Sequence, residues 1–236
     1  MALCGWDPVI YPAKVDERCL PGEDPAKYVL RVAECKAQAI LQQAPQDALV
    51  VAADTTVVDW EQVEGSLQVE DNLRKAVILG KPKDQYEACA MLRSLRGRSH
   101  QVYTGIVVIR AADRMVLRDV TVTEVAMRDY SEQELVEYAH SGDPLDKAGA
   151  YAIQHTGFHP VEQINGCYAN VMGLPVCSLA GLLLQFGIQP VSPIVAACRA
   201  SLGINCQIEE TVFSVHAASM HAEGVLADSK ISAGEV

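Results

Sequence analysis

The sequence lacks the patterns that mark exported, membrane-spanning and zinc-binding proteins. No apolar run approaches the roughly 20 residues that a membrane-spanning helix needs. Residues 1–7 carry neither the basic start nor the apolar stretch of a secretory signal. The eight cysteines include no Cys-x-x-Cys pair, and no histidine stands at ligand spacing beside them. We therefore expect a cytoplasmic protein with reduced cysteines and no membrane partner.

Positive charge is also scarce. The chain has 19 Lys and Arg against 30 Asp and Glu, a formal net charge of -11. Such a field repels a phosphate backbone, so we expect no long nucleic acid as a partner. The six histidines form no cluster, which leaves a histidine-based mechanism without support. A small anionic substrate remains compatible, because lysines, helix N-termini or a metal can oppose the overall charge locally.

What the chain does contain is a core-forming pattern of helices and strands over 236 residues, half of them hydrophobic. Apolar residues at helical spacing, with Asp or Ser caps or a Pro start, predict four helices. They begin near residues 25, 85, 132 and 175. Apolar or alternating runs predict strands at 48–53, 102–109 and 116–127, and one more at 206–215. Helices alternating with strands indicate an α/β fold, a mixed twisted sheet with flanking helices.

Asp54 is the first candidate for chemistry. It follows the short apolar run 48–53, which we interpret as a buried strand that ends there. Ligands of α/β sheets bind beyond the carboxyl ends of strands, so Asp54 is a candidate base or metal ligand. The hydroxyl of Thr55 follows it. The alternative is an Asp that merely caps a turn after the strand.

Lysines and an amide form the second group of candidates. Lys81 stands between Gly80 and Pro82, which suits a fixed charge against phosphate, although any loop lysine looks similar. Lys36 lies close to the apolar stripe of the first helix, where a lysine more often extends to solvent. The loop at 141–149, rich in Gly and Asp, leads to Gln154. Its backbone N–H groups could bind an anion, and Gln154 offers a donor and an acceptor to a base.

Taken in order and spacing, several blocks resemble the Maf family over about residues 5 to 188. Several blocks in sequence are far more specific than any single one. The blocks are Asp16-Glu17, residues 22–25, Lys36-Ala37, residues 53–55, residues 80–82, Gly97-Arg98 with His100, residues 103–105, residues 142–149 with Gln154, and residues 170–175.

The resemblance implies an Mg²⁺- or Mn²⁺-dependent nucleoside triphosphate pyrophosphatase with a fold similar to the inosine-triphosphate pyrophosphatases. By position, Asp54 looks like the catalytic acid/base and a metal ligand, with Glu17 as its partner at the metal. Lys36 and Lys81 look like phosphate contacts. Thr55 and Gln154 look like determinants of base choice. The segment 151–154 resembles the branch that cleaves dTTP and UTP, and the resemblance also suggests a homodimer.

The leading hypothesis is therefore hydrolysis of dTTP, UTP or a modified pyrimidine triphosphate to the monophosphate and pyrophosphate, a house-cleaning role in nucleotide metabolism. The alternative is a catalytically weak nucleotide-binding relative that acts in cell-division control. An unrelated α/β protein is the third reading, and the ordered blocks argue against it.

One expectation concerns the start of the chain. Members of the family begin with a strand and a Ser-x-Ser-x-Arg-Arg turn ahead of a segment like residues 5–7, and only four residues precede it here. We expect a pyrophosphatase domain at 1–190 without that first strand and Arg-rich turn, and favour a misassigned start codon. Residues 191–236 are expected to form an extension of unknown role.

Overall fold

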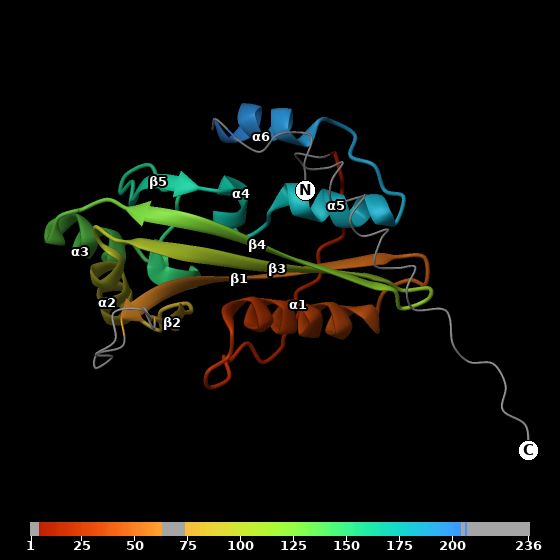
Figure 1. Ribbon diagram of the computed structural model, residues 1–236, viewed down its shortest axis with the longest axis horizontal. Coiled ribbons are helices and arrows are strands. Elements are labelled where there is room, and N and C mark those ends of the chain that lie inside the picture. Colours follow the sequence, from red (N-terminus) through yellow and green to blue (C-terminus); the bar gives the residue numbers. More distant parts are fainter. Residues whose placement is uncertain (1–4, 63–73, 204–205, 207–236) are drawn as a thin grey trace, which may run out of the picture.

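The fold is a five-stranded sheet with helices on both faces (Figure 1). A computed structural model describes residues 5–62, 74–203 and 206. The strand order is β2-β1-β3-β4-β5, and every pairing among these residues is antiparallel. The strands are β1 (Leu49–Gln62), β2 (Arg74–Leu79), β3 (Ser99–Arg110), β4 (Val116–Met127) and β5 (Val161–Asn165). The predicted α/β fold with flanking helices is confirmed, with antiparallel ladders.

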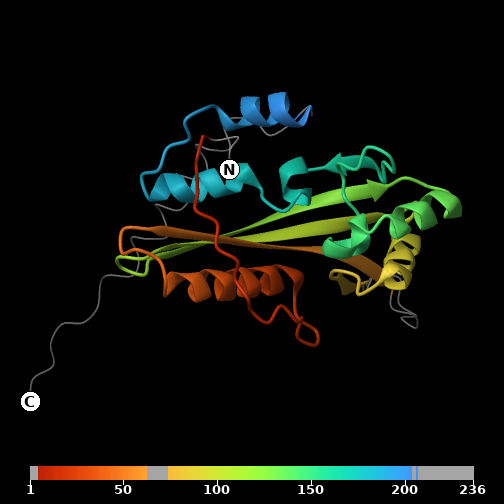
Figure 2. The same cartoon turned by 180° about the vertical axis from the view of Figure 1, so that it is seen from behind.

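The helices form layers around this sheet. Their bounds are α1 (Pro25–Leu41), α2 (Gln85–Leu95), α3 (Glu132–His140), α4 (Tyr168–Val171), α5 (Val176–Gln185) and α6 (Ile194–Leu202), with 3₁₀ turns at Asp143–Asp146 and Ala148–Ala150. In both views α1 lies along one face of the sheet, α5 lies along the other, and α6 lies outside α5 (Figures 1 and 2). Within the described part of the chain, no helix is long and apolar enough to cross a membrane.

Helix α1 forms where the sequence predicts it and docks closely on the sheet. The Asp24 side chain accepts a hydrogen bond from the Lys27 N–H at 3.1 Å, and a proline occupies the first turn. Its buried face includes Val29, Val32 and Ala33. At Gly105 of β3, an added Cβ would lie 2.7 Å from the Val29 backbone carbon. Glycine there lets the α1 backbone contact the strand directly, which fixes the helix against β1 and β3.

The predicted end of the first strand at Asp54 is wrong. Strand β1 continues to Gln62, and Asp54 lies within it, paired with Gly105 of β3. The residues at 55–58 are β-branched and suit a strand, so the polar Asp54 interrupts the apolar run without ending it. The carboxylate is tolerated there because it has a lysine partner, described below.

Several elements were not foreseen from the sequence. These are the edge strands β2 and β5, the single turn α4, and helix α6 within the predicted extension. Cys35 of α1 is exposed, whereas Cys89 of α2 is buried. The predicted strand at 206–215 lies outside the described residues apart from Cys206.

Candidate active site

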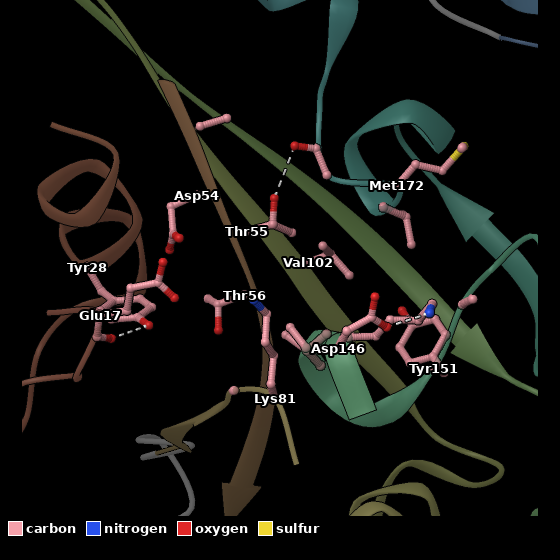
Figure 3. A pocket seen from close by; sticks show the side chains of 18 of the residues that line it. Glu17, Tyr28, Asp54, Thr55, Thr56, Lys81, Val102, Asp146, Tyr151 and Met172 are labelled. Carbon is pink, nitrogen blue, oxygen red and sulfur yellow. Dashed lines mark hydrogen bonds and ion pairs between the residues drawn. The ribbon is translucent and has the colours of Figure 1, made fainter. Parts of the chain in front are cut away.

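A cavity of about 530 Å³ opens along β1 and contains every residue singled out for chemistry. Glu17, Lys36, Asp54, Thr55, Lys81 and Gln154 all line it. They come from the segment before α1, from α1, from β1, from the loop after β2 and from the loop after the 3₁₀ turns. Figure 3 shows Asp54 and Glu17 toward one end of the cavity and Asp146 and Tyr151 toward the other, with Lys81 between them.

The geometry of β1 explains how neighbouring residues on opposite faces of the sheet line the same cavity. Successive side chains of a strand point to opposite faces of the sheet. Asp54 accordingly contacts α1, while the Thr55 hydroxyl lies 3.3 Å from the Gly173 carbonyl oxygen after α4. Strand β2 pairs only with residues 57–62 of β1. In the described part of the chain, the preceding stretch 49–56 has no strand on that edge, so the cavity reaches both faces around it.

At one end of the cavity, two carboxylates share one ammonium group. Lys36 Nζ lies 2.6 Å from Asp54 Oδ1 and 2.8 Å from Glu17 Oε1. Asp54 is only 8% exposed, whereas the Glu17 side chain is 42% exposed. The Tyr28 hydroxyl of α1 donates to the Glu17 carbonyl oxygen at 2.9 Å and ties this segment to the helix.

Burial and hydrogen bonds change the pKa values of Asp54 and Lys36. Desolvation raises the pKa of the Asp54 carboxyl, and the hydrogen bond from Lys36 opposes that rise without cancelling it. Burial lowers the pKa of the Lys36 ammonium, but hydrogen bonds to Asp54 and Glu17 outweigh it and leave the pKa raised. Lys36 therefore stays charged, and Asp54 binds a proton more readily than an ordinary aspartate. A carboxylate tuned this way suits general-base chemistry.

The same carboxylates decide whether a divalent cation fits. Asp54 and Glu17 converge on a position that already holds a cationic group, the Lys36 ammonium. No group of three or more His, Cys, Asp or Glu side chains among the described residues could hold a metal ion. Mg²⁺ is typically bound through one or two carboxylates together with substrate phosphates and water. The donor set fits such a shared ion and does not form a closed metal cage.

At the other end, Lys147 is held against the loop that carries it. Its Nζ lies 2.7 Å from Asp146 Oδ1 and 3.1 Å from Asp143 Oδ1. The Gly149 N–H donates to the Gly80 carbonyl oxygen at 3.1 Å, which joins this loop to the one carrying Lys81. Gly149 has a φ of 69°, and an added Cβ would lie 2.8 Å from a Val57 methyl group. Only glycine suits that position.

Sequence reasoning missed other residues that line the cavity. Lys147 and Met172 lay within matching blocks but received no role of their own, and Tyr28 of α1 was not singled out. Arg18 also lines the cavity and pairs with Asp16, with Nη2 2.6 Å from Oδ2. Asp146 and Tyr151 also lay within matching segments without a role of their own, whereas Thr56 was expected beside Thr55 as a second hydroxyl after Asp54. These residues line the cavity because of how the chain folds, which the spacing of residues in the sequence does not predict.

Comparison with known proteins shows which family the chain belongs to. The family model described as Maf-like protein matches residues 1–186. The dTTP/UTP pyrophosphatase of Anaeromyxobacter dehalogenans (strain 2CP-1 / ATCC BAA-258) is 45% identical over 180 residues, which cover 75% of this chain and 82% of that protein. The dTTP/UTP pyrophosphatase of Clostridium beijerinckii is 41% identical over 159 residues, covering 67% of this chain and 77% of that protein. The chain therefore belongs to the Maf family.

Proposed function

We propose that this protein hydrolyses dTTP, UTP or a modified pyrimidine triphosphate to the monophosphate and pyrophosphate. Its similarity to proteins named dTTP/UTP pyrophosphatase supports the substrate class. The single observation that carries the chemistry is the grouping of Asp54, Glu17, Lys36 and Lys81 in one cavity. That grouping combines a proton acceptor with fixed positive charge, which hydrolysis of a triphosphate requires.

The reaction breaks the bond between the α-phosphorus and the oxygen that bridges it to the β-phosphate. A water molecule attacks the α-phosphorus, its proton passes to Asp54, and pyrophosphate leaves with the bond electrons. Lys36 and Lys81 neutralise charge on the phosphate oxygens. Mg²⁺ or Mn²⁺, bound through Asp54 and Glu17, would supply further neutralisation. Gln154 presents an amide donor and acceptor, which match the O4 and N3–H of uracil or thymine.

The test is Asp54→Asn, which keeps the shape of the side chain and removes the base. We expect kcat for UTP to fall by roughly 10²- to 10⁴-fold, the range typical of a lost general base. Pyrophosphate release from a panel of triphosphates, with and without Mg²⁺, measures it. Asp47→Asn is the control, because Asp47 is exposed and does not line the cavity. An Asp54→Asn enzyme within a few-fold of the wild type would remove Asp54 from the mechanism.

The same panel of triphosphates distinguishes the hydrolase from the alternative, a catalytically weak nucleotide-binding relative that acts in cell-division control. Tight binding of dTTP or UTP without pyrophosphate release, by calorimetry and the release assay, would favour that alternative. The cytoplasmic location, the homodimer and the absence of long nucleic acid as a partner stay predictions. So does the division into residues 1–190 and 191–236.

A further inference from the structure

Two threonines on neighbouring strands connect the cavity to the turn that follows α4. Thr55 of β1 and Thr104 of β3 are directly paired across the antiparallel ladder, and their hydroxyl oxygens lie 2.8 Å apart. Thr55 lines the cavity, whereas Thr104 is 0% exposed and does not line it. In Figure 3 the Thr55 side chain points away from Asp54, toward the chain that follows Met172.

Each of these hydroxyl groups has an acceptor within the protein. The Thr55 hydroxyl lies 3.3 Å from the Gly173 carbonyl oxygen, and the Thr104 hydroxyl lies 3.3 Å from the Asn170 carbonyl oxygen. A hydroxyl group has one hydrogen to donate and two lone pairs that accept. With two carbonyl oxygens and each other as neighbours, both threonines can donate without using the cavity. What Thr55 then presents to the cavity is a lone pair.

The carbonyl oxygens stay in place because the turn itself is fastened to the sheet. Asn170 is fully buried, and its Nδ2 donates to the Val102 carbonyl oxygen at 3.0 Å and to the Thr123 hydroxyl at 2.9 Å. The Gly173 N–H donates to the Asn170 carbonyl oxygen at 2.9 Å and closes the turn. The acceptors around the two hydroxyls are therefore set by β3 and β4, not by the bound substrate.

We propose that Thr104 is a positioning residue that directs the Thr55 hydrogen into the protein, so that the substrate meets Thr55 through a hydrogen-bond donor of its own. This inference rests on the proposed function and concerns how the same cavity selects its nucleoside. UTP and dTTP share two such donors: the N3–H of the base, which would then bind Thr55 in place of the Gln154 amide oxygen, and the 3′-hydroxyl of the sugar. Cytosine carries a lone pair at N3, so the base arm also predicts discrimination against CTP.

The experiment compares UTP with N3-methyl-UTP and 3′-deoxy-UTP, each of which removes one donor. We expect one analogue to lose at least about 10-fold in kcat/KM with the wild-type enzyme, because an acceptor left unpaired in the site is costly. The loss should appear mainly in KM. In Thr104→Val, which removes the hydroxyl at nearly constant volume, the penalty should shrink several-fold. Thr104→Ser, which restores the hydroxyl, should retain it.

Two outcomes overturn the proposal. One is that neither analogue is disfavoured by the wild type. The other is a penalty of equal size in the wild type, Thr104→Val and Thr104→Ser, which would show that the penalty does not depend on the Thr104 hydroxyl. Should Thr104→Val melt too low to assay, Thr55→Val takes its place, since it removes the lone pair itself. A penalty that persists in Thr55→Val also overturns the proposal.

Failure of the proposed function would look different. An enzyme that binds UTP but cleaves no triphosphate contradicts the hydrolase, while the ratio of its dissociation constants for UTP and the two analogues still decides the role of Thr104. Calorimetry on the same set of variants gives those constants. A wild type that binds no UTP overturns both.

Discussion

His100 of β3 is a buried histidine for which the proposed mechanism has no use. It is 1% exposed, and its Nε2 lies 2.8 Å from the hydroxyl of Tyr151, a residue of the cavity wall. Its Nδ1 has no hydrogen-bond partner within the described residues. Burial, together with the charge of Arg98, lowers the pKa of His100 to about 4. The imidazole is therefore neutral in the folded protein near neutral pH.

That neutrality predicts a pH dependence of stability. In the unfolded chain a histidine has a pKa near 6.5, so between pH 6.5 and 4 the unfolded state binds more protons than the folded state. Folding stability then falls as the pH falls through this window, by up to about 3 kcal/mol from His100. Urea unfolding at pH 7 and pH 4.5 measures the loss. His100→Gln should reduce it by about 2 kcal/mol, because glutamine does not titrate.

His140→Gln is the matched control, since His140 is exposed at the end of α3. It should lose as much stability between the two pH values as the wild type does. An equal loss in His100→Gln and the wild type would mean that other groups carry the whole effect.

The candidate residues differ in how well their place in the site could be predicted from the sequence. Asp54 and Lys36 could be predicted because a charged residue interrupts or borders an apolar pattern. Tyr28 and Lys147 could not be assigned in the same way. Tyr28 also belongs to the buried face of α1, and Lys147 lines the cavity through a loop whose course glycines at 142 and 149 determine. Which side of a turn faces a cavity is decided by tertiary packing.

At the scale of elements, the contact between α1 and β3 decides where Lys36 lies. Gly105→Ala would place a Cβ 2.7 Å from the Val29 carbon and 2.8 Å from the Leu30 nitrogen, both of them backbone atoms that cannot rotate away. We expect the helix to shift and the free energy of unfolding to fall by about 1–3 kcal/mol, the usual cost of overpacking. Urea unfolding measures the change.

Gly181→Ala in α5 is the control for Gly105→Ala, because it makes the same substitution where there is space for it. An added Cβ at Gly181 meets nothing within 4 Å, and the residue lies inside a helix. Alanine should therefore stabilise the protein by about 0.5–1 kcal/mol. If Gly105→Ala were as harmless as Gly181→Ala, the close approach of α1 to β3 would not be a constraint.

The elements that sequence reasoning found share strong local signals. Helices α1, α2 and α3 have capping side chains at Asp24, Asp84 and Ser131, and each cap forms as predicted. Strands β2 and β5 are short edges of the sheet, and β5 is largely polar. Strand β5 forms because β4 pairs with it, which its polar sequence does not show, whereas β2 contains the apolar run 76–79, which could have predicted it. The end of β1 was misplaced because pairing with β3 carries the strand past Asp54.

At the scale of the whole molecule, the cavity joins parts from both faces of the sheet. Helix α1 contributes Lys36 and Tyr28 from one face, and the turn after α4 contributes Met172 and Gly173 from the other. They meet at residues 49–56 of β1, along the edge that no strand in the described part of the chain covers. The cavity therefore needs the helices on both faces of the sheet in place. The way in which the outer helices are attached then matters for function.

Helix α6 is the outermost of these attachments. It begins beyond residue 186, where the match to the family model ends. Ile194 and Cys198 pack in a buried cluster with Val176 and Ala180 of α5. Trp6 packs against the same cluster, and its Nε1 donates to the Gln189 carbonyl oxygen at 3.3 Å. The segment after α5 is thereby joined to the body of the protein from two directions.

This packing predicts that α6 unfolds together with the sheet. Ile194→Ala should lower the free energy of unfolding by about 2–4 kcal/mol, the usual cost of truncating a buried isoleucine. The urea transition should stay single with an unchanged slope, and kcat for UTP should hold at 25 °C, because α6 contributes no residue to the cavity. Val191→Ala is the control; Val191 is 79% exposed, so its change should stay within about 0.5 kcal/mol. Two separate transitions would instead show that α6 is a loosely attached unit and that its buried cluster adds nothing to the stability of the sheet.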